Sequence, residues 1–348
     1  MSETLLHAYW PLIFWTGLGL LSFSLLPDSL PRLLGRGLYW VGVPVQIFTL
    51  ARQTNFAAQV GLAPLVVGLA LIGGIGLAWS TLQLMQWVEG RSPLPAAAAT
   101  PIAPESAGEL GLFASTGALA PGSTDPASPV WADSARRGSF LIAATLGNTG
   151  FVGLAIAPSL VAEPYQGWLV FYSITQNVLG TYGLGVWLAS VYGRSHGGKR
   201  WWVHLRDVLT VPSLWAFGLG MLTRAMALPS FVDFALHASL WVIIPCALLL
   251  MGLRLRQIHG WRSLRLAIAP ALLRVLVLPV GVAGVAAMLG LSSEPRLALV
   301  LMSGMPTAFA GLILGEEYDL DRELIASSIV LTTAALLLTL PLWLLIFS

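Results

Sequence analysis

The chain has 348 residues, of which 56% are hydrophobic and only 10% are charged, whereas a soluble globular protein carries about 25% charged residues. With a mean hydropathy of +0.79 and repeated apolar runs of 18 or more residues, this composition excludes an ordinary water-soluble domain and predicts an integral membrane protein. The apolar runs are continuous rather than alternating, which excludes a porin-like barrel. The net charge of +2 carries little information as a sum, and no nucleic-acid partner is expected.

Hydropathy and the positions of loop-forming residues between the apolar runs predict an all-α protein with ten transmembrane helices. About 20 residues cross a bilayer as a helix, so the chain is long enough for all ten. The predicted spans are 8–26, 35–54, 62–88, 139–161, 165–192, 207–226, 232–253, 262–289, 295–314 and 322–347. The first span lacks a basic leader and a small-residue cleavage site, so we expect it to stay in the mature protein.

Two stretches between the spans divide the chain into regions. Residues 90–138 are rich in Pro, Ala, Ser and Gly and cannot bury enough apolar surface to order themselves, which predicts a flexible linker. Residues 194–206 combine cations with Trp201 and Trp202, which predicts an interfacial connector between two halves. The predicted regions are 1–89 with helices 1–3, the linker 90–138, 139–193 with helices 4 and 5, the connector 194–206, and 207–348 with helices 6–10.

The distribution of cations predicts the orientation. The loops after the odd-numbered spans hold 14 of the 18 Lys and Arg residues. By the positive-inside rule, that side is cytoplasmic and both termini lie outside. We expect the protein to reside in the plasma membrane, with the linker in the cytoplasm.

The two halves of the chain carry an internal repeat. Five pairs of motifs match. They are Pro11 and Gly17-Leu18-Gly19 with Pro212 and Gly218-Leu219-Gly220 at an offset of 201, Trp40-Val41 with Trp241-Val242 at the same offset, Ala63-Pro64 with Ala269-Pro270 at 206, Asn148-Thr149 with Pro306-Thr307 at 158, and Leu184 to Leu188 with Leu340 to Leu344 at 156. The offset falls after the third span by nearly the length of the linker, which only the first half contains. Each half has five spans, an odd number, so the second half starts on the opposite side of the membrane from the first. The repeat is therefore predicted to be inverted, as in secondary transporters that work by alternating access.

Spans 4 and 9 contain the stretches least compatible with a continuous helix. Span 4 has three Gly and an Asn within 147–153, and span 9 has Pro306 in its middle, where proline removes one backbone donor. Asn148 lies roughly 13 Å deep at 1.5 Å per residue, near the centre of the bilayer. We therefore predict broken helices that cross at the midplane and offer half-helix N-termini to an anion. The alternative is that these small residues only permit close helix packing.

Further polar residues inside the apolar spans are candidates for the wall of a polar cavity or for bonds between helices. Arg274 is the one cation well within a span, so it either pairs with a substrate carboxylate or extends to the cytoplasmic surface. The candidate substrate-binding residues are Asn148, Thr149, Gly150, Gly153, Pro306, Thr307, Gly311, Gln46, Gln176, Asn177 and Arg274.

Signals for soluble-type catalysis are absent from the sequence. It has no HExxH, GxSxG or P-loop motif and no cysteine pair, since Cys246 is its single Cys. The five His residues are scattered toward span ends, so no metal site is expected. We expect no enzyme activity and no cofactor, and the coupling ion, proton or sodium, stays open.

Spans 4, 9 and 10 also resemble a known family. The motifs Leu146 to Leu154, Met305-Pro-Thr-Ala, Glu316-Glu-Tyr and Leu340-Pro-Leu-Trp343 are similar to those of the auxin efflux carrier family, in the superfamily of bile acid, auxin and arsenite carriers. The resemblance implies a scaffold domain, a transport domain and a homodimer. It also implies a substrate site at helices 4 and 9, with Asn148, Thr149, Pro306 and Thr307 carried over.

The chain departs from the family pattern at three places. Ala155 and Gly311 stand where the family often has crossover prolines, and span 3 has no acid before Glu89, which gives no support to proton coupling through that span. The leading hypothesis is a secondary transporter that exports a small organic anion, either a monocarboxylate like auxin or a dicarboxylate. The alternatives are a sodium- or proton-coupled importer on the same fold and a non-transporting membrane sensor of a similar ligand.

Overall fold

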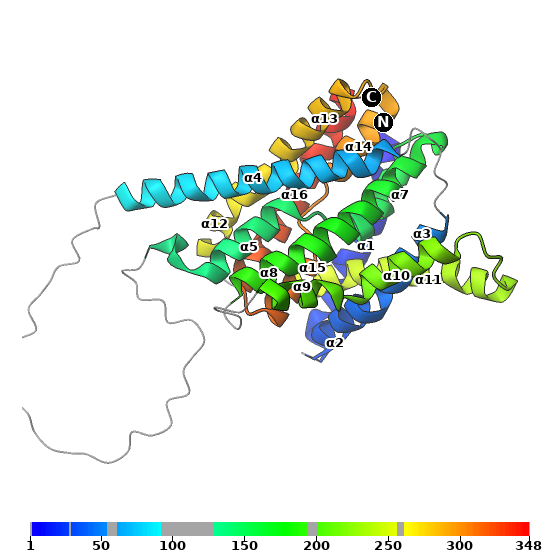
Figure 1. Ribbon diagram of the computed structural model, residues 1–348, viewed down its shortest axis with the longest axis horizontal. Coiled ribbons are helices and arrows are strands. Elements are labelled where there is room, and N and C mark those ends of the chain that lie inside the picture. The colour runs from blue at the N-terminus through cyan, green and yellow to red at the C-terminus, as the bar shows by residue number, and fades with distance from the viewer. Residues whose placement is uncertain are drawn as a thin grey trace, which may run out of the picture.

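The computed structural model describes residues 2–27, 29–53, 61–91, 129–193, 201–255 and 261–347. Within these ranges the regular elements are helices (Figure 1). Most of the predicted linker, residues 92–128, and the start of the predicted connector, residues 194–200, lie outside the described residues. The two marked ends of the chain lie at the same end of the molecule in Figure 1.

The first half of the chain forms helices that follow the predicted spans. They are α1 (Ser2–Ser22), η1 (Phe23–Leu25), α2 (Leu30–Gly37), η2 (Leu38–Gly42), α3 (Val43–Gln53), α4 (Leu62–Arg91), η3 (Val130–Ala132), α5 (Ser134–Thr145), η4 (Thr149–Gly153), α6 (Leu154–Ile156), η5 (Ala157–Ser159), η6 (Glu163–Tyr165), α7 (Gln166–Thr175), η7 (Gln176–Gly185) and α8 (Val186–Tyr192).

The second half repeats this alternation of long and interrupted helices. They are α9 (Trp201–Leu209), α10 (Pro212–Thr223), α11 (Ser230–Leu255), α12 (Trp261–Leu272), η9 (Leu273–Val277), α13 (Leu278–Met288), α14 (Ser293–Ser303), α15 (Ala310–Glu317) and α16 (Arg322–Phe347). The predicted connector ends at 206, and its last residues form the start of the short helix α9, which continues to Leu209.

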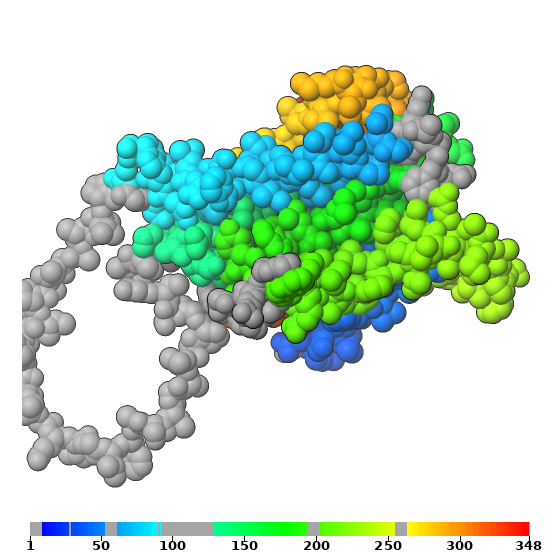
Figure 2. All heavy atoms as spheres, viewed as in Figure 1, coloured from blue at the N-terminus to red at the C-terminus, as the bar shows by residue number. Residues whose placement is uncertain are grey.

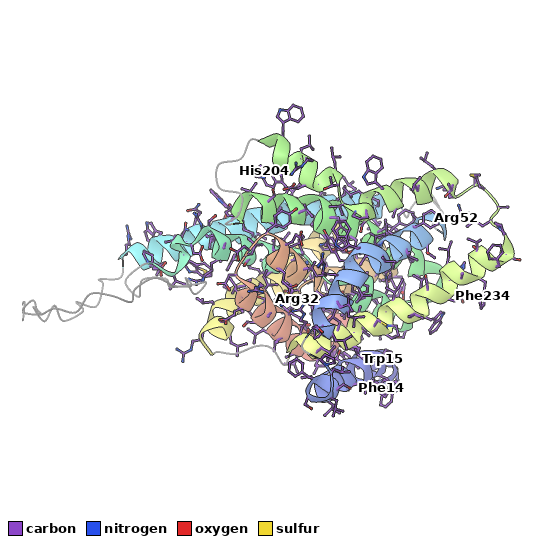
Figure 3. All side chains as sticks on the ribbon, turned by 90° about the horizontal axis from the view of Figure 1, so that it is seen from below. Phe14, Trp15, Arg32, Arg52, His204 and Phe234 are labelled. Carbon is purple, nitrogen blue, oxygen red and sulfur yellow. The ribbon has the colours of Figure 1, made fainter. Side chains whose placement is uncertain are left out.

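Four stretches among the described residues are long and apolar enough to cross a membrane: Leu62–Glu89, Ser230–Arg254, Ser263–Met288 and Arg322–Phe347. The prediction of an all-α membrane protein is therefore confirmed. The other predicted spans consist of shorter or interrupted helices. Large apolar side chains on the outer surface, such as Phe14 and Phe234 (Figure 3), are 46% and 75% exposed, as expected where lipid rather than water covers them.

The interruptions have local causes in the sequence. Proline has no N–H to bond the carbonyl four residues earlier, so that carbonyl is freed and the turn widens. The π-helical turn η2 (Leu38–Gly42) ends directly before Val43-Pro44, and the π-helical turn η9 (Leu273–Val277) ends directly before Leu278-Pro279. Prolines therefore mark where spans 2 and 8 are wound more loosely.

The helices pack as two groups. In one group α1 packs against α11 and α3 packs against α10, while in the other α12 packs against α16, α13 against α14 and α4 against α5. The first group is held by close backbone contacts: a Cβ on Gly19 would overlap the carbonyl of Leu249, and a Cβ on Gly252 would overlap that of Thr16. In Figure 2 the long α4 runs across the front of the second group beside α7.

Candidate functional site

The two interrupted helices meet in the interior of the molecule. Helix α5 ends at Thr145 and η4 begins at Thr149, while α14 ends at Ser303 and α15 begins at Ala310. The extended residues between them pair antiparallel, with a bridge between Gly147 and Thr307. The N–H of Asn148 donates to the carbonyl of Pro306 at 2.7 Å, and the N–H of Ala308 donates to that of Leu146 at 2.8 Å. The predicted breaks therefore lie where expected and contact each other.

Asn148 caps the helical turn that follows it. Its Oδ1 accepts hydrogen bonds from the N–H groups of Phe151 at 3.3 Å and Val152 at 3.4 Å. An N-cap side chain satisfies donors that would otherwise be open to an anion. The half-helix N-terminus of span 4 is thus partly occupied by the chain itself.

The threonines of the two motifs are fully buried. Two polar groups of Thr307 are hydrogen-bonded inside the protein: its N–H donates to Thr332 Oγ1 at 3.0 Å, and its hydroxyl donates to the carbonyl of Ala143 at 2.9 Å. Among the described residues, the hydroxyl of Thr149 has no hydrogen-bond partner. Thr307 therefore holds the two broken spans together, while the hydroxyl of Thr149 is available to hydrogen-bond another group.

Arg274 lies at the centre of this arrangement. It is fully buried, its Nε donates to the carbonyl of Met305 at 2.9 Å, and its Nη1 donates to the carbonyl of Thr145 at 2.8 Å. The expectation that the side chain extends to the cytoplasmic surface is wrong, because the ends of both broken helices supply acceptors inside the protein. Gly147 permits this approach, since a Cβ there would overlap the guanidinium.

The remaining polar candidates gather around η4. The Gln46 amide donates to the carbonyl of Gly150 at 2.8 Å. A Cβ on Gly150 would lie 3.0 Å from Asn177 Nδ2, which itself donates to the carbonyl of Ser173 at 2.9 Å. Gln176 reaches the carbonyl of Thr145 with a longer contact of 3.5 Å. Spans 2 and 5 thus supply amide side chains on the two sides of the broken span 4.

Gly153 and Gly311 stand in apolar surroundings. A Cβ on Gly153 would lie 3.0 Å from the sulfur of Met302, and one on Gly311 would lie 3.1 Å from Ile142. These contacts fit the alternative in which small residues let helices pack closely.

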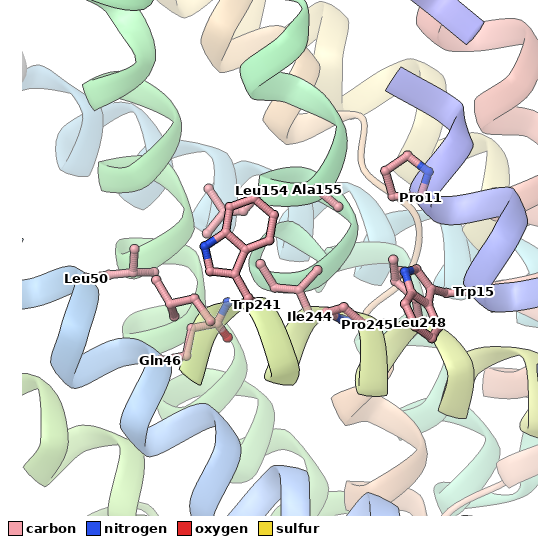
Figure 4. A pocket seen from close by; sticks show the side chains of 11 residues that line it. Pro11, Trp15, Gln46, Leu50, Leu154, Ala155, Trp241, Ile244, Pro245 and Leu248 are labelled. Atoms are coloured by element: carbon pink, nitrogen blue, oxygen red, sulfur yellow. The ribbon is translucent and has the colours of Figure 1, made fainter. Parts of the chain in front are cut away.

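A cavity of about 640 Å³ adjoins the broken span 4 (Figure 4). Side chains from α1, α3, α6 and α11 surround it: Pro11, Trp15, Gln46, Leu50, Leu154, Ala155, Leu240, Trp241, Ile244, Pro245 and Leu248. Gln46 is the one amide in this wall, and no charged side chain is among the described residues that line it. The cavity therefore suits a largely apolar molecule with a polar group beside Gln46.

Most of the cavity wall was missed by sequence reasoning. Of the eleven predicted residues only Gln46 lines the cavity, because polar and small residues were taken as candidates whereas the wall is mostly apolar. One signal was available, since Trp241 belongs to the repeated Trp-Val motif. Its partner Trp40 lines a second, smaller cleft of about 290 Å³ at the end of the molecule that is predicted to be cytoplasmic.

Ion pairs lie at that predicted cytoplasmic end. Arg254, near the end of α11, pairs with Glu316 of α15 at 2.7 Å, and Arg136 of α5 pairs with Asp321 at 2.9 Å. Nearby, the pKa of Tyr318 is raised above its usual value, mainly by burial and to a smaller extent by the carboxylates of Asp207 and Glu317. This phenol therefore stays protonated at neutral pH. The Arg254–Glu316 pair joins the two packing groups, because α15 packs against α5 and α16 of the second group.

One Ser-His-Asp set occurs, but its geometry differs from that of a hydrolase. The hydroxyl of Ser190 donates to Asp207 Oδ2 at 2.7 Å and lies 2.7 Å from Nδ1 of His204. In a catalytic triad the histidine stands between serine and aspartate, whereas here the buried serine does. Across the described residues, no group of three or more His, Cys, Asp or Glu side chains could hold a metal ion.

Comparison with known proteins places this architecture among transporters. Residues 201–344 match the family described as "Membrane transport protein". The chain is similar to an uncharacterized transporter of Methanothermobacter thermautotrophicus, with 29% identity over 216 residues, which is 61% of this chain and 68% of that protein. It is also similar to an uncharacterized transporter of Methanocaldococcus jannaschii, with 26% identity over 211 residues, which is 59% of this chain and 67% of that protein. The chain is therefore similar to membrane transport proteins over its second half and to two curated transporters over about three fifths of its length.

Proposed function

We propose that this protein is a secondary transporter that exports a small amphipathic organic anion by alternating access. The observation that carries the proposal is the position of the 640 Å³ cavity. Gln46 lines this cavity and bonds the carbonyl of Gly150 in the broken span 4. A ligand in the cavity would therefore lie between the α1–α11 packing group and the crossover, where relative movement of the two groups could carry it across the membrane.

Reciprocal contacts support ten spans arranged as an inverted repeat. Gly19 of span 1 packs against span 7, and its repeat partner Gly220 of span 6 packs against Phe48 and Ala51 of span 2. Asn148 and Pro306, which match in the repeat, hydrogen-bond to each other. A pseudo-twofold axis that exchanges the two halves would turn the contact of span 1 with span 7 into the contact of span 6 with span 2. It would also bring the matching residues of spans 4 and 9 together at the axis.

The cavity wall favours one class of organic anion. Two tryptophans and six aliphatic side chains face the ligand, with one amide, so a flat apolar body with a single carboxylate is better matched than a small dicarboxylate. Burial of two carboxylates without charged partners would cost several kcal/mol per ion. Indole-3-acetate is therefore a better probe than malonate.

The two ends of the molecule support an outward-facing state. With the orientation predicted from the arginines, the wall residues Pro11 and Ala155 lie toward the outside, and Trp241 at the cavity edge is 84% exposed. At the other end the Arg254–Glu316 pair joins the two packing groups. Export would require this pair to separate when the cleft lined by Trp40 opens.

The test is flux of radiolabelled indole-3-acetate, malonate and a bile acid into proteoliposomes that contain purified full-length protein. Trp241→Ala and Gln46→Ala should abolish saturable flux, while Trp79→Ala and Gln83→Ala, at exposed positions on α4, should leave it unchanged. Saturable flux that both pairs of variants affect equally would refute the proposed site.

The same assay separates the alternatives. Flux that requires an inward sodium or proton gradient would favour a coupled importer on this fold. Binding of a probe that Trp241→Ala removes, without flux of any probe in either direction, would favour a membrane sensor.

A further inference from the structure

Arg274 is an unusual cation for the interior of a membrane protein. It is the one charged side chain among the buried described residues, and an intramembrane charge normally pairs with another charge or with a substrate. Its neighbours are instead backbone carbonyls from two different spans, those of Thr145 and Met305. The partner of this charge is therefore the pair of broken helices itself.

The charges of this arrangement balance without a carboxylate. Thr145 ends α5, which has 12 residues, and Met305 follows the end of α14, which has 11 residues. The C-terminus of an α-helix carries about half a negative charge, so two converging C-termini together offer about one. A single guanidinium neutralises both.

The guanidinium also occupies acceptors that a coupling cation would need. In transporters with broken helices, carbonyls freed at the breaks and the C-terminal ends of half-helices coordinate the coupling cation. Here the carbonyls of Thr145 and Met305 accept from Nη1 and Nε of Arg274 at 2.8 and 2.9 Å. A sodium ion at this place would meet a fixed positive charge at hydrogen-bonding distance from the same oxygens.

We propose that Arg274 is a built-in cation that takes the place of a coupling ion at the crossover, so that anion transport by this chain needs no sodium. The inference rests on the proposed function. It makes Arg274 a positioning residue, which holds the two breaks in register and leaves the substrate carboxylate to other groups. It also predicts that charge at position 274 matters more than side-chain shape.

The first experiment measures binding of ²²Na⁺ to purified full-length wild-type protein by scintillation proximity. We expect no saturable binding above that of the heat-unfolded protein. Saturable binding would overturn the inference. This measurement does not depend on a correct choice of substrate, so it stays decisive even if flux of every anion is absent and the proposed function fails.

The second experiment compares initial flux in sodium chloride and in choline chloride for wild type and three variants. Wild-type flux should be the same in both salts, and stimulation by sodium would overturn the inference. Arg274→Gln should lose flux in both salts, and Arg274→Lys, which keeps the charge, should retain most of it. The control Arg296→Gln removes an arginine that bonds the Leu291 carbonyl away from the crossover and should behave as wild type.

A role in packing alone would affect the glutamine and lysine variants alike, because neither reproduces the guanidinium shape. Equal loss in both variants, or wild-type flux in Arg274→Gln, would overturn the inference. If Arg274→Gln does not fold, the two measurements on wild-type protein still decide it.

Discussion

Substitution of Gly147 by alanine tests the geometry around Arg274 directly. A Cβ at this position would overlap Arg274 Nη2, so the guanidinium must leave its place between the two broken helices. It would then lose its hydrogen bonds to Thr145 and Met305, which are 2.8 and 2.9 Å long. Hydrogen bonds to a charged group contribute about 1.5–3 kcal/mol each, so we expect a loss of about 3–6 kcal/mol in the free energy of unfolding.

The assay is thermal unfolding of the purified protein in detergent, followed by tryptophan fluorescence. At about 2 °C per kcal/mol for a chain of this size, Tm should fall by about 6–12 °C. The control is Gly73→Ala on α4, where a Cβ would meet no atom within 4 Å. Because alanine is favoured over glycine inside a helix by about 0.5–1 kcal/mol, this variant should be slightly more stable than wild type.

A double-mutant cycle separates the proposed cause from a general effect on the backbone. If displacement of the guanidinium causes the loss, Gly147→Ala should cost little once Arg274→Met has removed it. Additive losses in the double variant, or a Tm for Gly147→Ala within about 2 °C of wild type, would refute the reasoning.

Three other predictions follow from the packing. Replacement of residues 92–128 by a short Gly-Ser bridge should leave Tm unchanged. The two ends of the replaced segment are already joined, because the carboxylate of Glu89 accepts from the N–H of Val130 at 2.5 Å. A large fall in Tm would show that the replaced residues support the fold. Gly252→Ala would overlap the backbone of α1 and should cost about 1–3 kcal/mol by overpacking, whereas Gly218→Ala, in open space, should not lower Tm. Glu316→Arg should lower Tm through loss of the pair with Arg254, and the exchange Arg254→Glu/Glu316→Arg should recover part of it; no recovery would mean that the pair does not join the two groups.

Hydropathy predicted the four long apolar stretches Leu62–Glu89, Ser230–Arg254, Ser263–Met288 and Arg322–Phe347, because a helix that crosses a bilayer needs about 20 apolar residues. The breaks were also predictable, because Gly147, Gly150 and Pro306 disturb helices locally. The prediction that the two breaks are in contact depended on the repeat, which aligns Asn148 with Pro306. The N–H of Asn148 does donate to the carbonyl of Pro306.

The surroundings of Arg274 and the cavity could not be predicted in the same way. Sequence position gives the depth of a side chain but not its neighbours, and the acceptors of Arg274 come from two other spans. The cavity wall is mostly apolar, and apolar residues that face a cavity look the same in a sequence as those that face lipid. The repeated Trp-Val motif singles out Trp241, but its place in the cavity wall depends on how spans 1, 2 and 7 come together in the fold.

The contact between Gly19 and Leu249 has a consequence for biosynthesis. The ribosome adds about 5–20 residues per second, and about 230 residues separate these two positions, so α1 waits roughly 10–50 s for its neighbour to be made. During that interval the face of α1 that contains Gly19 is without its final cover. The insertion machinery or lipid must shield this face until α11 arrives, and truncated chains that end before α11 should be recognised and degraded.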